Sequence, residues 1–141
     1  MTPEDLDEVI RIEQTTESPW SAKLFASEFE LTNGWRFVFQ DEAAAKIVGF
    51  IIGTITIDEA EIRKIAVAPE FRQRKIASFL LGESLAFLKE QKAASCFLEL
   101  RKSNRAAFGL YEKHGFKKAG ERKKYYKNPV EDALIMHKNI G

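Results

Sequence analysis

The chain has 141 residues, of which 45% are hydrophobic, and this length and composition are typical of one domain closed around a single core. We therefore expect residues 1–141 to form a single domain. Lysine and arginine number 22 against 21 aspartate and glutamate residues, which gives a formal net charge of +1. This balance gives no overall reason to expect a nucleic acid or an anionic membrane as the main partner.

Neither a membrane span nor an export signal is predicted. No apolar run approaches the roughly 20 residues that cross a bilayer, and the start Met1-Thr2-Pro3-Glu4-Asp5 lacks the basic and apolar regions of a signal peptide. The single cysteine, Cys96, has no disulfide partner in the chain, and one cysteine with two histidines offers no metal-ligand spacing. We expect a cytoplasmic protein without a metal.

The first third of the chain predicts two helices. Thr2 is a suitable N-cap before Pro3, and apolar residues follow at helical spacing as far as Glu13. Residues 18–21 break this helix, and Ser21 can cap a second one. Two helices joined by a short loop are therefore expected before the first strand.

Aromatic and β-branched runs next predict an antiparallel meander over residues 35–39, 47–57 and 60–67. Pro69 closes the last of these strands, because it cannot donate to a ladder. Apolar residues at helical intervals predict the longest helix over residues 73–91. The remaining predicted elements are a strand at 96–100, a helix at 105–113 ended by Gly115, and strands at 116–120 and 134–136 around a loop that contains Tyr125 and Tyr126. This order indicates an α/β sheet with helices on both faces.

Three cations, Arg72, Arg74 and Lys75, lie where the strand at 60–67 hands over to the long helix. Basic side chains at a helix N-terminus oppose the helix dipole, at a cost of about 0.3 to 1 kcal/mol each, unless an anion binds the free N–H groups. A bound phosphate would resolve this conflict. A solvated basic turn is the alternative interpretation.

The run Ile65-Ala66-Val67-Ala68-Pro69-Glu70-Phe71-Arg72-Gln73-Arg74-Lys75-Ile76-Ala77 resembles the central motif of the GNAT superfamily of N-acetyltransferases. In that motif a hydrophobic strand and a proline precede R/Q-x-x-G-x-G/A at the start of a helix. The resemblance implies a GNAT-type α/β fold, with a mixed, largely antiparallel twisted sheet, and acetyl-CoA as cosubstrate. The implied donor-binding residues are Ile65, Ala66 and Val67 at the pantetheine, and Arg72, Gln73, Arg74, Lys75, Ile76, Ala77 and Ser78 at the pyrophosphate.

Two features depart from the family pattern. The first motif glycine is Lys75 here, and a Cβ at that position obstructs the approach of backbone to phosphate. The lysine offers a positive charge in exchange. Family members usually begin with a strand before the first helix, whereas Met1 here falls at the helix cap. Either the sheet is one edge strand short, or the chosen start site omits that strand.

Acetyl transfer from a thioester to an amine needs a neutral amine and a protonated leaving thiolate, so a base and an acid both help. Glu99 lies inside an apolar strand and would be partly desolvated there, which suits a base. The alternative is that Glu99 faces solvent or pairs structurally with Arg101 or Arg63. Tyr111 lies on the next helix, where an aromatic is most often core, and suits an acid if its hydroxyl points toward the sulfur.

The segment over residues 98–116 is similar to one GNAT subgroup, the ribosomal-protein-alanine N-acetyltransferases. The similarity implies that Glu99 is the general base, that Asn104 contacts CoA and that Tyr111 protonates the thiolate. A plain N-cap is the alternative for Asn104. The positions that frame the slot for a protein N-terminus are Trp20, Tyr125 and Tyr126, for which half-buried aromatic packing is the alternative. The implied function is direct transfer of an acetyl group to the N-terminal α-amine of a protein, in particular a ribosomal protein, within a ternary complex.

Two other functions remain open from the sequence. The same scaffold can acetylate a lysine side chain or a small amine, or it can serve as a non-catalytic acyl-CoA-binding module. The presence of both Glu99 and Tyr111 argues against the module.

Two charged segments near the expected acceptor side allow more than one interpretation. Arg122-Lys123-Lys124 before two tyrosines is compatible with RNA contact, but three cations on a surface hairpin are more often solvated, so no direct nucleic-acid role is expected. The acidic residues Asp58, Glu59 and Glu61 are candidates for contact with a basic substrate tail. His114, beside Gly115, is expected to be a cation at a helix C-terminus.

Overall fold

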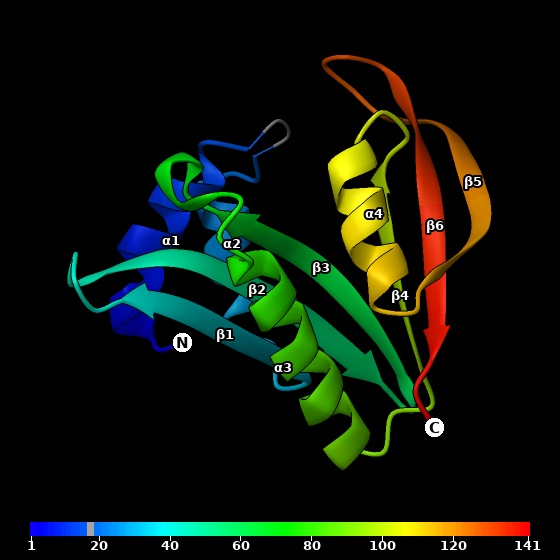
Figure 1. The fold of residues 1–141 in the computed structure, drawn as a ribbon, viewed down its shortest axis with the longest axis horizontal. Coiled ribbons are helices and arrows are strands. Elements are labelled where there is room, and N and C mark those ends of the chain that lie inside the picture. Colours follow the sequence, from blue (N-terminus) through cyan, green and yellow to red (C-terminus); the bar gives the residue numbers. More distant parts are fainter. Residues whose placement is uncertain (17–18) are drawn as a thin grey trace.

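The computed structural model describes residues 1–16 and 19–141 (Figure 1). Ser18, the first residue of the expected break between the two helices, lies outside the described residues. The N-terminal elements are the 3-10 helix η1 (Pro3–Asp5), α1 (Leu6–Glu13) and α2 (Ala22–Glu28). They are followed by β1 (Gly34–Asp41), β2 (Lys46–Thr56), β3 (Glu59–Val67), the 3-10 helix η2 (Pro69–Phe71), α3 (Ile76–Glu90), β4 (Ser95–Arg101), α4 (Arg105–Lys113), β5 (Lys117–Tyr126) and β6 (Glu131–Asn139).

The strands of the described residues form one sheet in the order β1-β2-β3-β4-β6-β5. All neighbours are antiparallel except β3 and β4, which are parallel. Helices α1 and α2 lie on one face of the sheet, and α3 and α4 lie on the other (Figure 1). The predicted mixed, largely antiparallel sheet with helices on both faces is confirmed.

Strand β2 is apolar without alternation because helices cover both of its faces. Val48 and Ile51 pack into the core beneath α3, whereas Phe50 and Ile52 pack into a second core beneath α1. All four side chains are at most 2% exposed. The long apolar run in the sequence therefore marks the centre of the sheet rather than an edge.

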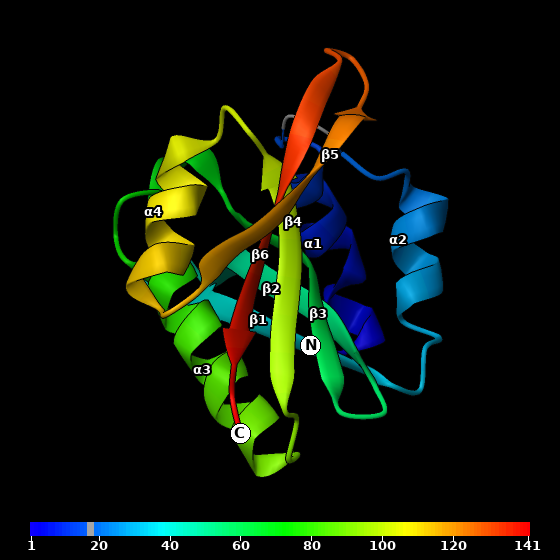
Figure 2. The same ribbon diagram turned by 90° about the vertical axis from the view of Figure 1, so that its right-hand side faces the viewer.

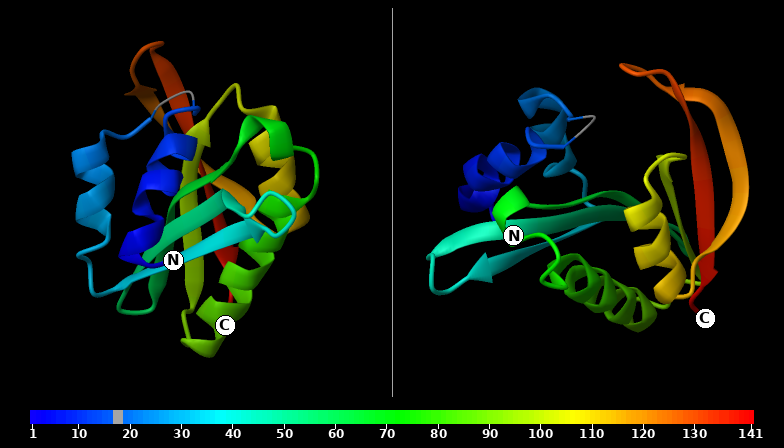
Figure 3. Two further views of the ribbon diagram at one scale, coloured as in Figure 1. Left: turned by 90° about the vertical axis from the view of Figure 1, so that its left-hand side faces the viewer. Right: turned by 45° about the horizontal axis from the view of Figure 1, so that its top comes forward.

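Strands β3 and β4 pair only along their first residues, 59–62 with 95–98, and then separate. Separation begins at a β-bulge, because Ile52 pairs with Lys64 while Gly53 pairs with Ile62, which leaves Arg63 as an extra residue on β3. Bulges bend a strand and increase its local twist. Figure 3 shows the resulting opening between β3 on one side and β4 with α4 on the other. The backbone edges of both strands are unpaired across this opening.

Two boundaries differ from the sequence prediction. The helix predicted from residue 73 begins at Ile76, because Gln73 and Lys75 adopt left-handed backbone conformations with φ of 64° and 63°. Tyr125 and Tyr126, expected in a loop, are the last residues of β5. The loop between the closing strands is consequently shorter than expected.

The cap residues of α4 behave as predicted. The Asn104 side chain accepts a hydrogen bond from the Ala107 backbone at 3.1 Å. Gly115 follows the helix with φ of 92°, and the backbone N–H groups of Gly115 and Phe116 donate to the carbonyls of Glu112 and Tyr111. This is a Schellman motif, which only glycine adopts without strain.

The described residues contain no strand before η1, and β1 forms one edge of the sheet. The amino group of Met1 lies at this edge and donates to the Arg36 carbonyl at 3.4 Å. Among the described residues, no helix has both the length and the apolar character needed to cross a membrane.

Candidate active site

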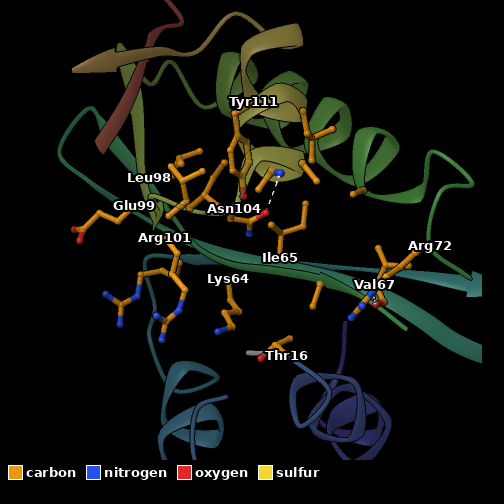
Figure 4. Close-up of a pocket in the computed structure, with 18 of the residues that line it drawn as sticks. Thr16, Lys64, Ile65, Val67, Arg72, Leu98, Glu99, Arg101, Asn104 and Tyr111 are labelled. Carbon is orange, nitrogen blue, oxygen red and sulfur yellow. Dashed lines mark hydrogen bonds between the residues drawn. The ribbon is translucent and has the colours of Figure 1, made fainter. Parts of the chain in front are cut away.

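A groove of about 1580 Å³ occupies the opening between β3 and β4 (Figure 4). Its volume exceeds the roughly 300 to 1,000 Å³ of a typical small-molecule pocket, so it can accommodate a long ligand together with a second reactant. Of the residues predicted to bind the donor, only Arg74 does not line the groove; its guanidinium instead packs over the Phe71 ring at 4.9 Å. The predicted donor residues that line it are Ile65, Ala66, Val67, Arg72, Gln73, Lys75, Ile76, Ala77, Ser78 and Asn104.

Along β3, the side chains of Ile65 and Val67 face the α3 and α4 side of the sheet, where they join the larger core. Ala66, expected beside them, turns its side chain into the core beneath α1. Only the Ala66 backbone can therefore face a donor in the groove. Arg72 Nε donates to the Val67 carbonyl at 3.1 Å, which ties the loop before α3 to the end of β3.

The N-terminus of α3 opens toward the same groove. Its N-cap residue is Lys75, in the left-handed conformation, and no side chain caps this end within the described residues. The first backbone N–H groups of the helix therefore remain available to an anion, together with the dipole. Arg72 and Lys75 add positive charge at the rim.

A hydrogen bond joins the first turn of α3 to the end of α4. Ser78 Oγ and His114 Nε2 are 2.8 Å apart. Burial lowers the pKa of His114, and the nearby charge of Lys138 lowers it further. Both effects, and the position of the half-buried ring between two helices, favour the neutral ring over the cation expected at the helix C-terminus.

Tyr111 projects from α4 with its hydroxyl pointing into the groove, close to Asn104 (Figure 4). The residue is only 5% exposed, and its ring packs on Phe116 with centroids 5.8 Å apart. Burial raises the pKa of Tyr111 above its ordinary value of 10. The hydroxyl is consequently a proton donor throughout the neutral range.

Glu99 lies on β4 between Leu98 and Leu100, which both pack into the core on the α4 side. Because side chains alternate along a strand, its carboxylate points to the other face, away from Tyr111 (Figure 4). The side chain is 14% exposed, and Glu99 Oε2 lies 3.5 Å from Arg122 Nε. Within the described residues its cationic partner is thus Arg122, whereas Arg63 pairs with Glu28 and Glu61, and Arg101 with Glu131.

Residues 6–116 match the acetyltransferase (GNAT) family. The chain belongs to this family of acetyltransferases. The ribosomal protein bS18-alanine N-acetyltransferase of Escherichia coli strain K12 is 38% identical over 136 residues, which cover 94% of this chain and 89% of that protein.

Solved structures agree with this assignment. The ribosomal-protein-S18-alanine N-acetyltransferase from Escherichia coli superposes with a TM-score of 0.93 at 34% identity, over 100% of this chain and 91% of that one. Ard1 from Thermoplasma volcanium superposes with a TM-score of 0.90 at 29% identity, over 100% and 95% of the two chains. The GNAT fold and the N-acetyltransferase activity predicted from the motifs are confirmed.

A second carboxylate, Glu61, lines the groove of this GNAT acetyltransferase beside Glu99. Burial raises the pKa of Glu61, and the negative charge of Glu99 raises it further. The positive charge of Arg63 opposes this rise, since Arg63 Nη1 lies 3.6 Å from Glu61 Oε1. The sequence suggested only a contact with a basic tail for Glu61. Its coupling to Glu99 arises from the parallel pairing of β3 with β4, which is not visible in local sequence.

The three aromatic residues predicted on the acceptor side all line the groove. Trp20 packs on Phe25 with ring centroids 5.8 Å apart, and Tyr125 is 49% exposed at the other wall. Tyr126 stands edge-on to Tyr125 at 5.1 Å and lies under the Arg101 guanidinium at 4.6 Å. Burial raises the pKa of Tyr126 to about 12. The three rings are therefore brought to one cleft by elements far apart in sequence.

Glu13, to which the sequence assigned no role, connects Trp20 with Lys64, and both of these residues line the groove. It is fully buried at the end of α1, and its Oε2 accepts a hydrogen bond from the Trp20 backbone at 2.8 Å. The same oxygen lies 3.1 Å from Lys64 Nζ, while Oε1 makes no hydrogen bond within the described residues. A glutamate one residue after Ile12 and four after Val9 falls on the buried face of α1, which is the signal that marks it.

Proposed function

We propose that this enzyme transfers the acetyl group of acetyl-CoA to the N-terminal α-amine of a protein, in particular a ribosomal protein that begins with alanine. The single observation that carries the proposal is the position of the β3–β4 opening between Tyr111 on one face of the sheet and Glu99 on the other. A donor and an acceptor can enter from opposite faces and meet in the opening. The activity of the E. coli relative, a ribosomal protein bS18-alanine N-acetyltransferase, supports the choice of acceptor.

The groove offers a suitable binding site for acetyl-CoA as the donor. The unpaired edge of β3 after Ile62 presents backbone groups to the amides of a pantetheine arm, as in strand addition to a sheet edge. The uncapped N-terminus of α3 and the cations Arg72 and Lys75 suit the pyrophosphate. Acetyl-CoA supplies the thioester, whose carbonyl carbon is the electrophile.

Glu99 and Tyr111 then carry out separate proton transfers. Glu99 accepts a proton from the acceptor ammonium on its own face of the sheet, so that the amine nitrogen has a free lone pair. The nitrogen bonds to the carbonyl carbon and releases its second proton to the solvent, and the C–S bond breaks. The sulfur takes a proton from the Tyr111 hydroxyl, which the solvent then reprotonates, or from a donor that Tyr111 orients. The amine gains the acetyl group and becomes an amide, the cosubstrate leaves as a thiol, and no covalent enzyme intermediate is required.

The acceptor slot suits an extended peptide rather than a compact amine. Trp20 on one wall and Tyr125 with Tyr126 on the other flank the approach to Glu99. Large rigid rings provide contact area at low entropic cost, so they suit the first residues of a protein chain. A ribosomal protein acceptor would place the reaction in the cytoplasm.

The acceptor class is tested with two matched peptides and acetyl-CoA. One has a free N-terminal alanine and arginine in place of every lysine; the other has a blocked N-terminus and one internal lysine. Thiol release and mass spectrometry are expected to show acetylation of the first peptide only. Acetylation restricted to the lysine peptide would instead favour a side-chain acetyltransferase.

The non-catalytic alternative is separated by calorimetry. Binding of acetyl-CoA without thiol release over a broad panel of acceptors would favour an acyl-CoA-binding module. The natural acceptor is then identified by mass spectrometry of protein N-termini in cells with and without the gene. We expect one ribosomal protein to lose its N-terminal acetyl group in the deletion strain.

A further inference from the structure

The net charge of +1 conceals a strong separation of charge along the chain. Residues 95–141, which form β4, α4, β5 and β6, carry eleven lysine and arginine residues against five aspartate and glutamate residues. Residues 1–94 carry eleven against sixteen. The C-terminal part of the sheet is therefore basic, while the part with α1, α2 and α3 is acidic.

The excess positive charge is concentrated on the outermost strand. Strand β5 is the free edge of the sheet next to β6 (Figure 2). Six exposed cations follow one another along this strand and its turn, and we name them the basic arm: Lys117, Lys118, Arg122, Lys123, Lys124 and Lys127. The basic arm borders the acceptor side of the groove, since Tyr125 belongs to the same strand.

Acidic neighbours neutralise only part of the basic arm. Lys118 and Lys123 lie 2.8 Å and 3.5 Å from the Glu121 carboxylate, and Lys123 is also 3.3 Å from Asp132. Lys117, Lys124 and Lys127 form no ion pair within the described residues. Arg122 approaches Glu99 at 3.5 Å but is itself 54% exposed. The arm therefore keeps a net positive surface after its own ion pairs are formed.

A shallow hollow of about 370 Å³ lies at the start of the arm, where the first residues of β5 pair with the last residues of β6. Lys117, Lys118, His137 and Lys138 line it, and none of its lining residues is an aspartate or glutamate. Lys138 crosses over Gly115, since a Cβ built there would lie 2.6 Å from Lys138 Nζ. Cations from two strands thus surround one space that suits a phosphate group.

We propose that the basic arm is a docking surface for the phosphate backbone of structured RNA, which reverses the expectation from the sequence that these cations are simply solvated. A row of exposed cations along a strand edge matches the repeating charge of a nucleic acid backbone. An anionic membrane is the weaker candidate, because elements that bind a membrane surface need an apolar face. In β5 and the turn that follows it, the exposed large hydrophobic side chains are only Tyr125 and Val130. RNA binding does not depend on acetyl transfer, although it suits an enzyme whose acceptor is a ribosomal protein.

The alternative explanation for these cations is protection of the sheet edge, because edge lysines block pairing with other chains. Charge of either sign provides that protection, whereas RNA binding requires positive charge. Replacement of lysine by glutamate therefore separates the two explanations. Lys117→Glu with Lys124→Glu reverses charge on the arm, and Lys23→Glu with Lys89→Glu makes the same change of charge at exposed positions on α2 and α3.

Binding is measured by fluorescence anisotropy of a labelled RNA hairpin with the full chain at low and at physiological salt. The unmodified protein is expected to bind with a dissociation constant of about 10⁻⁴ to 10⁻⁶ M, and this constant should increase as the salt concentration rises. The arm variant is expected to bind at least about tenfold more weakly, and the α2–α3 variant to stay within about twofold of the unmodified protein. Thermal melting and acetyl-CoA binding check that both variants are folded.

Three results would overturn the proposal. The first is no RNA binding by the unmodified protein at low salt. The second is an equal loss of RNA binding in the two variants, which would indicate a general effect of net charge. The third is arm-dependent sedimentation with phosphatidylserine vesicles in a protein that does not bind the RNA hairpin, which would assign the surface to a membrane instead.

Discussion

Glu99 and Tyr111 approach the β3–β4 opening from opposite faces of the sheet. Leu98 and Leu100 turn toward α4, so Glu99 between them turns away from the helix that carries Tyr111. An acid and a base on the same face would compete for one space. In the proposed mechanism, their separation leaves room for a thioester beside the tyrosine and an amine beside the glutamate, with the reacting atoms meeting in the gap between the strands.

The carboxylate of Glu99 is expected to control the chemical step. Glu99→Gln keeps the shape of the side chain but removes the base, so turnover should fall by about a hundred- to ten-thousand-fold, the range for loss of a general base. Acetyl-CoA affinity, measured by calorimetry, should stay within about twofold, because the donor residues lie on β3, α3 and α4.

Glu61→Gln is the matched control, because Glu61 is the neighbouring carboxylate in the same groove. Its effect on turnover should be much smaller than that of Glu99→Gln. If Glu61→Gln were the more damaging change, the base would have to be reassigned to β3.

The hydroxyl of Tyr111 is expected to act on the leaving sulfur. Tyr111→Phe keeps the ring that packs on Phe116, so the melting temperature should change little. Turnover should fall by about tenfold or more, and a better thiol leaving group should restore part of the loss. Because burial raises the pKa of Tyr111, the hydroxyl should not contribute a titration to the pH–rate profile below its raised pKa. Full activity in the phenylalanine variant would remove Tyr111 from the mechanism.

Much of the fold follows from local sequence signals. Ser21 and Asn104 cap their helices as predicted, Gly115 ends α4 in a left-handed conformation, and the apolar run of β2 marks the doubly covered centre of the sheet. Each of these features depends on residues within a few positions of one another. Local chemistry is sufficient to place them.

The features that shape the site depend on residues distant in sequence. The bulge at Arg63 opens the sheet, and it becomes visible only through the pairing of β3 with β2. Glu13 reaches Lys64 only after α1 packs against β3. The cations along β5 are close in sequence, and the run Arg122-Lys123-Lys124 is visible there, but their position at the free edge of the sheet follows only from the pairing of β5 with β6. Long-range packing decides these contacts, so composition and periodicity do not reveal them.

Lys75 occupies the motif glycine position in a left-handed conformation, with φ of 63°. A side chain other than glycine costs about 1 kcal/mol in this region. Lys75→Gly should therefore raise the free energy of unfolding by about 1 kcal/mol and the melting temperature by about 3 °C. Lys75→Ala removes the same charge but keeps the Cβ, so the glycine variant should be the more stable of the two, and the difference between them isolates the backbone.

Acetyl-CoA binding by the two Lys75 variants tests the role of the charge. The alanine variant should bind more weakly than the unmodified protein, because one cation at the pyrophosphate seat is lost. The glycine variant should recover part of this affinity through closer approach of the backbone. Equal melting temperatures for the two variants would show that the backbone at this position is not strained.

Glu13 makes the stability of the acceptor side depend on pH. Burial raises the pKa of Glu13 above its ordinary value of 4.5, although the Trp20 N–H and Lys64 oppose the rise. Between 4.5 and the raised value, the folded protein holds this proton more tightly than the unfolded chain does. Raising the pH through that window therefore lowers the free energy of unfolding, by about 1.4 kcal/mol for each unit by which the pKa is raised.

Glu13→Gln removes this titration while keeping an oxygen that can accept the hydrogen bond of the Trp20 backbone. Denaturant unfolding between pH 4 and pH 8 should show that the variant gains stability relative to the unmodified protein as the pH rises. Glu30→Gln, which removes an exposed carboxylate after α2, controls for the change in net charge. If the free energy of unfolding differed between Glu13→Gln and the unmodified protein by the same amount at every pH in this range, the buried carboxyl would not titrate there. Loss of the Lys64 contact should also raise the KM for the acceptor peptide without changing acetyl-CoA affinity, because Glu13 contacts both Lys64 and Trp20, and Trp20 belongs to the proposed acceptor side.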